Sequence, residues 1–145
     1  MKRYLNTAAV AFVAGVAVVF GVTTAIPIAV RLEERAFPVI ADWRATDWYA
    51  EGNDLIVTGL MTKSRDCAYS PPPGARDSAT GVNYLVQSMS RTPVRTWDSS
   101  PKPQKFGPWR VLGGAGKQIE FYLEYRCHPL WATTELVGGV DGTTR

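Results

Sequence analysis

The sequence KQIEFYLEYRC, residues 117–127, decides the fold class, because apolar and polar side chains alternate along it without a break. The side chains expected on its apolar face are Ile119, Phe121, Leu123, Tyr125 and Cys127. Successive side chains of an extended chain point to opposite sides, so this period of two residues predicts a β-strand with one face in a hydrophobic core. The other face is expected to meet solvent or a partner.

Weaker segments of the same type lie around it, separated by glycine and proline. We expect strands from residue 39 to about 50, from 55 to about 69, and at 81–90, 106–112 and 131–137, with a short edge strand at 94–97. The sequence EGND at 51–54 predicts a hairpin, and SPPPG at 70–74 predicts a stiff surface loop, because proline cannot donate a ladder hydrogen bond. Six or seven short strands predict an all-β sandwich over residues 38–139, followed by a polar tail at 140–145.

Residues 7–30, TAAVAFVAGVAVVFGVTTAIPIAV, carry no charge and predict a single transmembrane helix within an N-terminal anchor at 1–34. As a helix this run is roughly 36 Å long, which exceeds the roughly 30 Å of a hydrocarbon core. Lys2 and Arg3 precede the run, and no acidic residue occurs before Glu33. The positive-inside rule therefore places the N-terminus in the cytoplasm and the rest of the chain outside.

A cleaved signal peptide is the alternative, because Thr23, Thr24 and Ala25 resemble the small-residue pattern before a cleavage site. We favour an uncleaved anchor, since Pro27 follows the candidate cut and the apolar run continues to Val30. The membrane bilayer is then the first expected partner.

The composition is that of one globular domain, since 46% of the residues are hydrophobic and 20% are charged. The formal net charge is +3, but Lys2 and Arg3 lie on the cytoplasmic side of the predicted anchor. Without these two, 14 of the 16 basic residues remain on the outer side, against 13 acidic residues. Residues of both signs are interspersed along this part of the chain. This pattern lacks the basic stripe of a nucleic-acid-binding surface, so no nucleic-acid partner is expected.

Cys67 and Cys127 both follow the anchor, in the compartment that the predicted topology makes oxidising. Extracytoplasmic cysteines commonly pair, and we expect a disulfide here, with two buried free thiols as the alternative. A metal site is disfavoured, because the sole histidine, His128, is adjacent to Cys127 and neighbours on a strand point to opposite faces.

Tyr125, Arg126 and Cys127 are similar to the Tyr-x-Cys sequence of immunoglobulin-type domains, and Cys67 lies 60 residues earlier, where such a domain has the cysteine of its second strand. The resemblance implies an immunoglobulin-like β-sandwich with one inter-sheet disulfide between Cys67 and Cys127. Two features depart from that family. No tryptophan follows Cys67 at the usual distance, and Tyr125 lies inside an alternating strand rather than at a corner.

The chain also looks like small uncharacterised membrane-anchored proteins of bacteria and their phages, on the combination of its anchor with DLIVTG at 54–59, KSRDC at 63–67 and RCHPLW at 126–131. This likeness implies a bacterial inner-membrane protein with a periplasmic C-terminal domain, or a phage-encoded membrane or virion protein. It implies no activity and no site residues.

Groups suited to catalysis are scarce, and we expect neither an enzyme nor a cofactor. With one histidine, two cysteines expected to pair and no serine in a nucleophile-elbow sequence, nucleophilic catalysis lacks its usual groups. Glu120 and Glu124 share a strand face but lie about 13 Å apart by strand rise, which is too far for a glycosidase pair.

Tryptophan is strongly enriched in interface anchors, and Trp97, Trp109 and Trp131 lie in or beside expected loops. We therefore expect a non-enzymatic interaction or accessory module of a membrane complex, which contacts another protein through these tryptophans and Pro71–Pro73. Core filling is the other use of such tryptophans. The alternative function is a periplasmic small-ligand-binding domain, or a cleaved secreted protein, with a pocket between its sheets walled by Tyr84, Tyr125 and His128.

Overall fold

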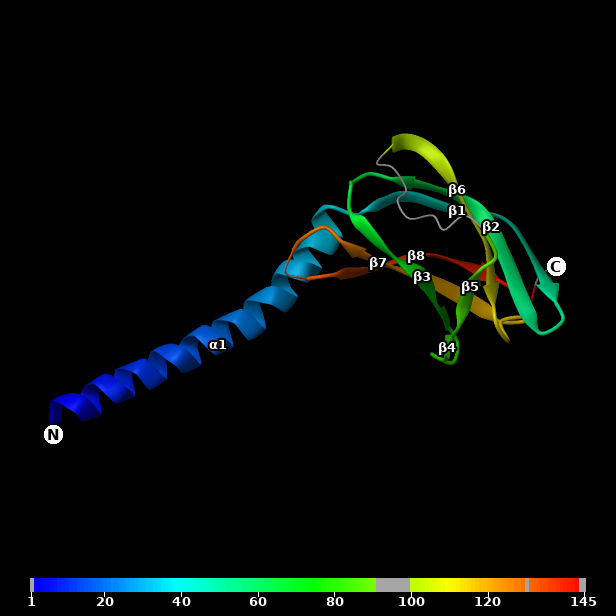
Figure 1. The fold of residues 1–145 in the computed structure, drawn as a ribbon. Coiled ribbons are helices and arrows are strands. Elements are labelled where there is room, and N and C mark those ends of the chain that lie inside the picture. The colour runs from blue at the N-terminus through cyan, green and yellow to red at the C-terminus, as the bar shows by residue number, and fades with distance from the viewer. Residues whose placement is uncertain (1, 91–99, 130, 144–145) are drawn as a thin grey trace. The chain divides into compact units, whose positions relative to one another are not determined.

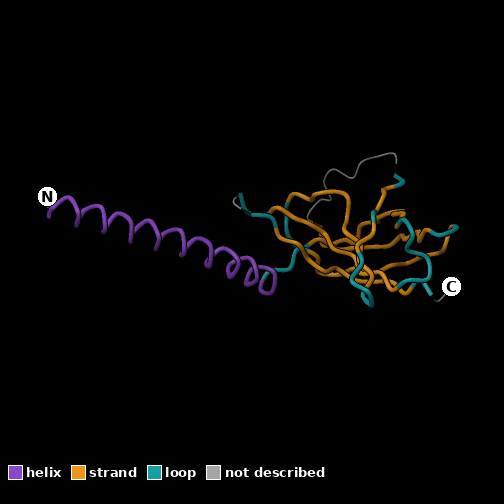
Figure 2. The backbone as a smooth tube through the Cα atoms, turned by 90° about the horizontal axis from the view of Figure 1, so that it is seen from below, coloured by secondary structure: helices purple, strands orange, loops and turns teal. Residues whose placement is uncertain are grey.

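A computed structural model describes residues 2–90, 100–129 and 131–143 of the chain. The chain divides into two compact units, Met1–Ala36 and Phe37–Arg145 (Figure 1). The first unit is a helix, α1 (Lys2–Ala36), and the second is built mainly from β-strands (Figure 2). The prediction of an apolar N-terminal helix followed by a β domain is confirmed.

Helix α1 contains the apolar run. Its segment Phe12–Glu33 is 22 residues long with a mean hydropathy of 2.2, which is long and apolar enough to cross a membrane, although an N-terminal signal sequence meets the same criterion. The hydroxyls of Thr23 and Thr24 donate to the carbonyl oxygens of Val19 and Phe20, at 2.9 and 2.8 Å. The two hydroxyl groups are therefore hydrogen-bonded within the helix and need no water.

The β domain consists of two four-stranded antiparallel sheets. The first has the order β1-β2-β6-β5, with the bounds β1 (Ile40–Glu51), β2 (Asp54–Lys63), β6 (Ser100–Val111) and β5 (Val86–Ser88). The second has the order β4-β3-β7-β8, with the bounds β4 (Asn83–Tyr84), β3 (Ala68–Asp77), β7 (Gln118–Arg126) and β8 (Thr133–Asp141). The described residues thus hold eight strands, where six or seven were expected.

The core lies between the two sheets, and β7 supplies its centre. Four alternate side chains of this strand are at most 1% exposed: Ile119, Phe121, Leu123 and Tyr125. The residues between them are half-buried or exposed, which confirms the alternation predicted for this stretch. The predicted hairpin at residues 51–54 is also confirmed, because β1 and β2 pair up to Glu51 and Asp54.

An aromatic cluster fills the core around Phe121. It comprises Trp43, Phe106 and Trp109, whose rings lie with centroids 4.5 to 5.8 Å from their neighbours in the cluster. Trp43 needs a glycine opposite it, because a Cβ atom on Gly138 would lie 2.2 Å from its ring. Large rings from both sheets therefore fix how β1, β6, β7 and β8 pack.

The three consecutive prolines lie in strand β3, and the prediction of a surface loop is wrong. Ser70 is opposite Glu124 of β7 and Gly74 is opposite Tyr122, so Pro71–Pro73 form a bulge between two paired positions. On the other edge of β3, β4 pairs with the two residues that follow Gly74. Proline is accommodated at such a bulge because no ladder hydrogen bond is required of it there.

Three other bounds differ from the prediction. Residues 81–90 contain two strands, β4 and β5, in different sheets, because the chain crosses between the sheets at Leu85. The second strand ends at Lys63 rather than near residue 69. The last strand continues to Asp141, past position 140, where the tail was expected to begin. The expected edge strand at 94–97 lies outside the described residues.

Candidate functional site

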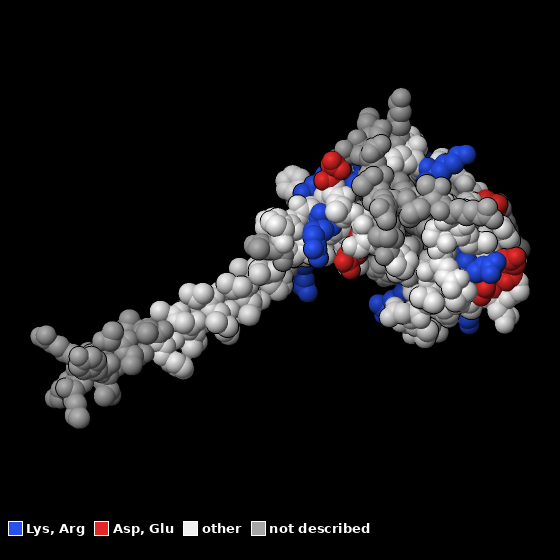
Figure 3. Space-filling view, viewed as in Figure 1, with Lys and Arg blue, Asp and Glu red and all other residues white. Residues whose placement is uncertain are grey.

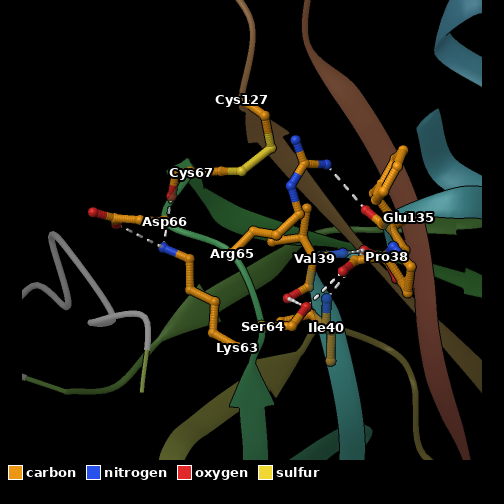
Figure 4. Close-up of a disulfide and its surroundings, with 11 residues drawn as sticks. Pro38, Val39, Ile40, Lys63, Ser64, Arg65, Asp66, Cys67, Cys127 and Glu135 are labelled. Carbon is orange, nitrogen blue, oxygen red and sulfur yellow. Dashed lines mark hydrogen bonds and ion pairs between the residues drawn. A yellow bond between two sulfur atoms is a disulfide. The ribbon is translucent and has the colours of Figure 1, made fainter. Parts of the chain in front are cut away.

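One end of the β domain receives the chain from α1, and we call it the entry end. It consists of the entry segment Phe37–Ile40, the loop Ser64–Cys67 between β2 and β3, and residues 127–129 and 131–132 between β7 and β8. These segments meet because β1 and β8 begin, and β2 and β7 end, at the same end of the sandwich. Figure 4 shows the entry segment and the loop together with the disulfide.

The loop holds the carbonyl groups of the entry segment (Figure 4). The Ser64 hydroxyl lies 2.6 Å from the carbonyl oxygen of Pro38 and 3.0 Å from that of Val39. The Ser64 N–H donates to the Val39 carbonyl at 2.8 Å, and Arg65 Nη1 donates to the Phe37 carbonyl at 3.0 Å. Two adjacent loop residues therefore satisfy three successive carbonyl groups.

The amide groups of the entry segment bind a carboxylate from β8. Glu135 Oε2 accepts hydrogen bonds from the N–H groups of Val39, at 3.2 Å, and Ile40, at 3.4 Å. Both residues are buried, so the carboxylate supplies the acceptor that water would otherwise provide. Because two of its amides and three of its carbonyls are bonded to the β domain, the entry segment is part of that domain.

The disulfide closes the loop that holds the entry segment. Cys67 and Cys127 are bonded, as predicted, with their Cα atoms 4.5 Å apart. The inter-sheet geometry implied by the family resemblance is wrong. The adjacent residues Ala68 and Arg126 are a register pair of β3 and β7, so the disulfide extends the ladder of two neighbouring strands in one sheet.

A buried lysine packs beneath this loop. The Lys63 side chain is 2% exposed, and its Nζ donates to the carbonyl oxygen of Cys67 at 2.6 Å. Asp66 Oδ1 lies 3.9 Å from the same nitrogen. A buried ammonium group needs such partners, so the lysine and the conformation of the loop depend on each other.

The solvent side of the entry end carries aromatic rings and cations. Phe37 is 63% exposed, and the Arg65 guanidinium carbon lies 5.9 Å from the centroid of its ring. The rings of His128 and Trp131 stack with centroids 3.8 Å apart and planes 10° from parallel. Amphipathic rings beside cations are suited to a surface that is partly apolar and partly charged, such as a protein interface or a membrane surface.

The residues singled out in the sequence lie in different environments in the structure. Trp109 is 3% exposed and fills the core, so it is not the partner contact that was predicted. The strand predicted at 106–112, which includes this tryptophan, is confirmed as the second half of β6. Trp131 lies half-buried at the entry end, and Trp97 lies outside the described residues. Lys2 and Arg3 are in the first turn of α1, where side chains are not described.

The expected pocket between Tyr84, Tyr125 and His128 is not formed. Tyr84 lies beside Gly113, at the end of the domain opposite the entry end, whereas His128 is at the entry end. Tyr125 is fully buried, and its hydroxyl has no hydrogen-bond partner within the described part of the chain. Burial, reinforced by the Glu135 carboxylate, raises the pKa of Tyr125 well above its usual value, so this side chain stays neutral.

A groove on the outer face of the second sheet was not anticipated. It has a volume of about 360 Å³ and runs over β7 and β8, with a lining that includes Gln118, Glu120, Leu136, Gly139 and Asp141. Glu120 accepts a hydrogen bond from the Tyr122 hydroxyl at 2.9 Å, which raises the pKa of Tyr122. The glycine pair at 138–139 is the sequence feature that could have predicted this groove, because it removes side chains from both faces of β8.

Exposed apolar side chains flank the crossover between the sheets. Val82, Leu85 and Met89 are 44 to 60% exposed and lie before, between and after β4 and β5. The sequence analysis did not identify these residues as an exposed group, because the single strand predicted at 81–90 placed Val82 and Leu85 on opposite faces. Charged side chains, by contrast, lie in small groups of mixed sign over the face seen in Figure 3.

No group of three or more His, Cys, Asp or Glu side chains within the described ranges is arranged to hold a metal ion. No protein-family model, curated protein or solved structure matches the chain. A function for the chain therefore has to be inferred from its own structural features.

Proposed function

We propose that the chain is a single-pass membrane protein that displays an immunoglobulin-like β-sandwich outside the membrane as a non-enzymatic interaction module. In this proposal α1 is an uncleaved anchor in a bacterial inner membrane, with Lys2 and Arg3 in the cytoplasm and the β domain in the periplasm. The observation that carries the proposal is the combination of an apolar helix segment, Phe12–Glu33, that is long enough to span a membrane with a disulfide-bonded β domain after it.

The apolar part of α1 supports an anchor over a cleaved leader. A cut after Ala25 would leave residues 26–36 attached to the secreted β domain. The first five of these, Ile-Pro-Ile-Ala-Val, are apolar and would be exposed to water. An anchor keeps them in lipid instead.

The disulfide and the charge distribution support the outward orientation. A disulfide persists in oxidising compartments and is rare in the cytosol, so the Cys67–Cys127 bond fits a periplasmic domain. Lys2 and Arg3, at the other end of α1, fit a cytoplasmic N-terminus.

The strand order supports an immunoglobulin-like sandwich. In the constant-type immunoglobulin domain the sheets are A-B-E-D and C-F-G. Lettering β1 to β8 as A, B, C, C′, D, E, F and G turns the observed orders into A-B-E-D and C′-C-F-G. The residues that first suggested the family contribute less, because Tyr125 is buried in mid-strand and the disulfide joins neighbours within one sheet.

Exposed apolar side chains support a protein partner. Val82, Leu85 and Met89 are exposed around β4 and β5, and methionine is enriched in protein interfaces. We assign the partner contact to Val82, Leu85 and Met89. A small ligand in the groove over β7 and β8 is the second candidate function, favoured by the volume and the mixed lining of that groove.

Two measurements test the anchor. Mass spectrometry of the chain purified from membranes should find the residues before Ala25 still attached, and a C-terminal reporter enzyme that is active in the periplasm alone should be active. A mass that begins at Ile26 refutes the anchor, and activity of a cytoplasm-specific reporter refutes the orientation.

The interaction role is tested by purification with the anchor intact. A stoichiometric partner should be lost from the L85S/M89S variant and retained by L136S, a matched control because Leu136 is 52% exposed but lines the groove. A partner that is retained by L85S/M89S refutes the assigned contact, and a small molecule that co-purifies and is lost from L136S supports the ligand-binding role instead.

A further inference from the structure

We infer that the entry end rests on the phospholipid headgroups of the outer leaflet, with Phe37 and Trp131 at the headgroup boundary. This inference rests on the proposed role of α1 as an uncleaved anchor. The surface that the entry end contacts is a layer of phosphodiester headgroups over an apolar interior.

The length of α1 places the entry segment at the headgroup layer. The uncharged run ends at Val30, and the six residues from Arg31 to Ala36 add about 9 Å of helix. The headgroup zone of one leaflet is roughly 5–8 Å thick, taken as half the difference between the whole bilayer and its hydrocarbon core. Phe37 therefore leaves the membrane near the outer boundary of the headgroups.

The entry end cannot move far from that boundary. Phe37 and Pro38 are the two residues between the end of α1 and the buried Val39, and two extended residues span at most about 7 Å. The bonds from Ser64, Arg65 and Glu135 remove the slack that a flexible linker would provide. This bound follows from chain connectivity and holds at any angle between the two units.

The aromatic residues of the entry end are of the kind found at membrane interfaces. Phe37 exposes 63% of its surface to solvent in the first residue after α1. Trp131 is half-buried and stacked on His128, so its ring is held in one orientation. Tryptophan is enriched at the headgroup level, and phenylalanine in the same layer removes apolar surface from water.

Two arginines lie at the entry end. Arg65 lies over the Phe37 ring and donates a hydrogen bond to the Phe37 carbonyl, and Arg126 is exposed at the end of β7. Asp66 is exposed on the same loop but lies 3.9 Å from the Lys63 ammonium, which partly offsets its charge. Arginine binds phosphate oxygens by charge-assisted hydrogen bonds.

The experiment uses the full chain in phosphatidylcholine nanodiscs that contain a lipid with a gadolinium-chelating headgroup. Relaxation enhancement is measured by NMR for the amides of the loop Ser64–Cys67 and for those of the turns at 52–53 and 113–116, at the opposite end. We expect strong enhancement at the loop and weak enhancement at the turns. Phe37→Ser should lower the ratio of docked to undocked domain about tenfold, since an aromatic ring leaves the interface. The contrast between the loop and the turns should then shrink, because the undocked domain can tilt about its short connection to the membrane.

Two further variants separate docking from mere attachment. Tyr49→Ser removes an aromatic ring that is 49% exposed beside the far turn, and it should leave the enhancement at the loop unchanged. Phe37→Trp should restore docking. An equal contrast between loop and turn enhancement in the wild type and Phe37→Ser, with the fold intact by amide shifts, overturns the inference while the anchor stands. Release of the wild-type chain from membranes by alkaline carbonate overturns the anchor itself.

Discussion

Removing the disulfide should cost the β domain a large part of its stability. The bond joins residues 60 positions apart, and for a loop of that length the chain-entropy model gives about 4 kcal/mol of stabilisation. A unit of the size of Phe37–Arg145 shifts its Tm by roughly 4 °C for each kcal/mol. We therefore expect the Cys67→Ala/Cys127→Ala variant to unfold roughly 15–20 °C below the wild type.

Tryptophan fluorescence of the full chain in detergent is a suitable assay, because all five tryptophans lie after residue 36 and α1 contributes none. The control is the wild type under reducing conditions, which should unfold within a few degrees of the double variant. A drop of less than about 5 °C in both samples would show that the cross-link does not limit unfolding. A drop confined to the variant would assign the effect to lost packing around Cys67.

Three further changes test other parts of the β domain. Gly138→Ala should destabilise it by about 1–3 kcal/mol in urea unfolding, because the new Cβ meets the Trp43 ring at 2.2 Å, whereas Gly74→Ala, with ordinary contacts from 3.6 Å, should be nearly neutral. Glu135→Ala should cost about 2 kcal/mol in the same assay, since two buried amides lose their acceptor; a change below about 0.5 kcal/mol contradicts that role. Hydrogen bonds from the Thr80 hydroxyl and the Ala79 amide lower the pKa of Asp77, so its contribution is present above about pH 4 and is lost as the pH falls below that value. Asp77→Asn should therefore flatten the acid limb of the stability profile, and an unchanged limb would refute this assignment.

Local patterns were sufficient for the strand and turn that depend on neighbouring residues. The alternation from Ile119 to Tyr125 is a property of one segment, and so is the turn signal between β1 and β2. The disulfide was predictable from the compartment, because pairing of Cys67 with Cys127 requires no knowledge of the fold. Its place within one sheet was not, because that depends on the register of β3 against β7.

The remaining features depend on contacts between distant parts of the chain. Glu135 bonds the amide of Val39 across 96 positions, and no local pattern marks a β8 carboxylate as the acceptor for the first residues of the domain. A strand around Trp109 was predicted, but the burial of its ring depends on packing against Phe121 of the other sheet. The split at Leu85 was hidden because each half of residues 81–90 alternates correctly, while the two halves belong to different sheets.

The proline bulge in β3 also affects how copies of the chain meet one another. Strand β4 covers Ala75 and Arg76 of β3 and stops, so the edge of β3 next to Pro71–Pro73 has no β-strand partner among the described residues. An open edge invites another strand to add to it, and anchoring in a bilayer raises the concentration of copies that share the plane. Proline has no N–H to donate, so this edge is a poor template for edge-to-edge aggregation between neighbouring molecules.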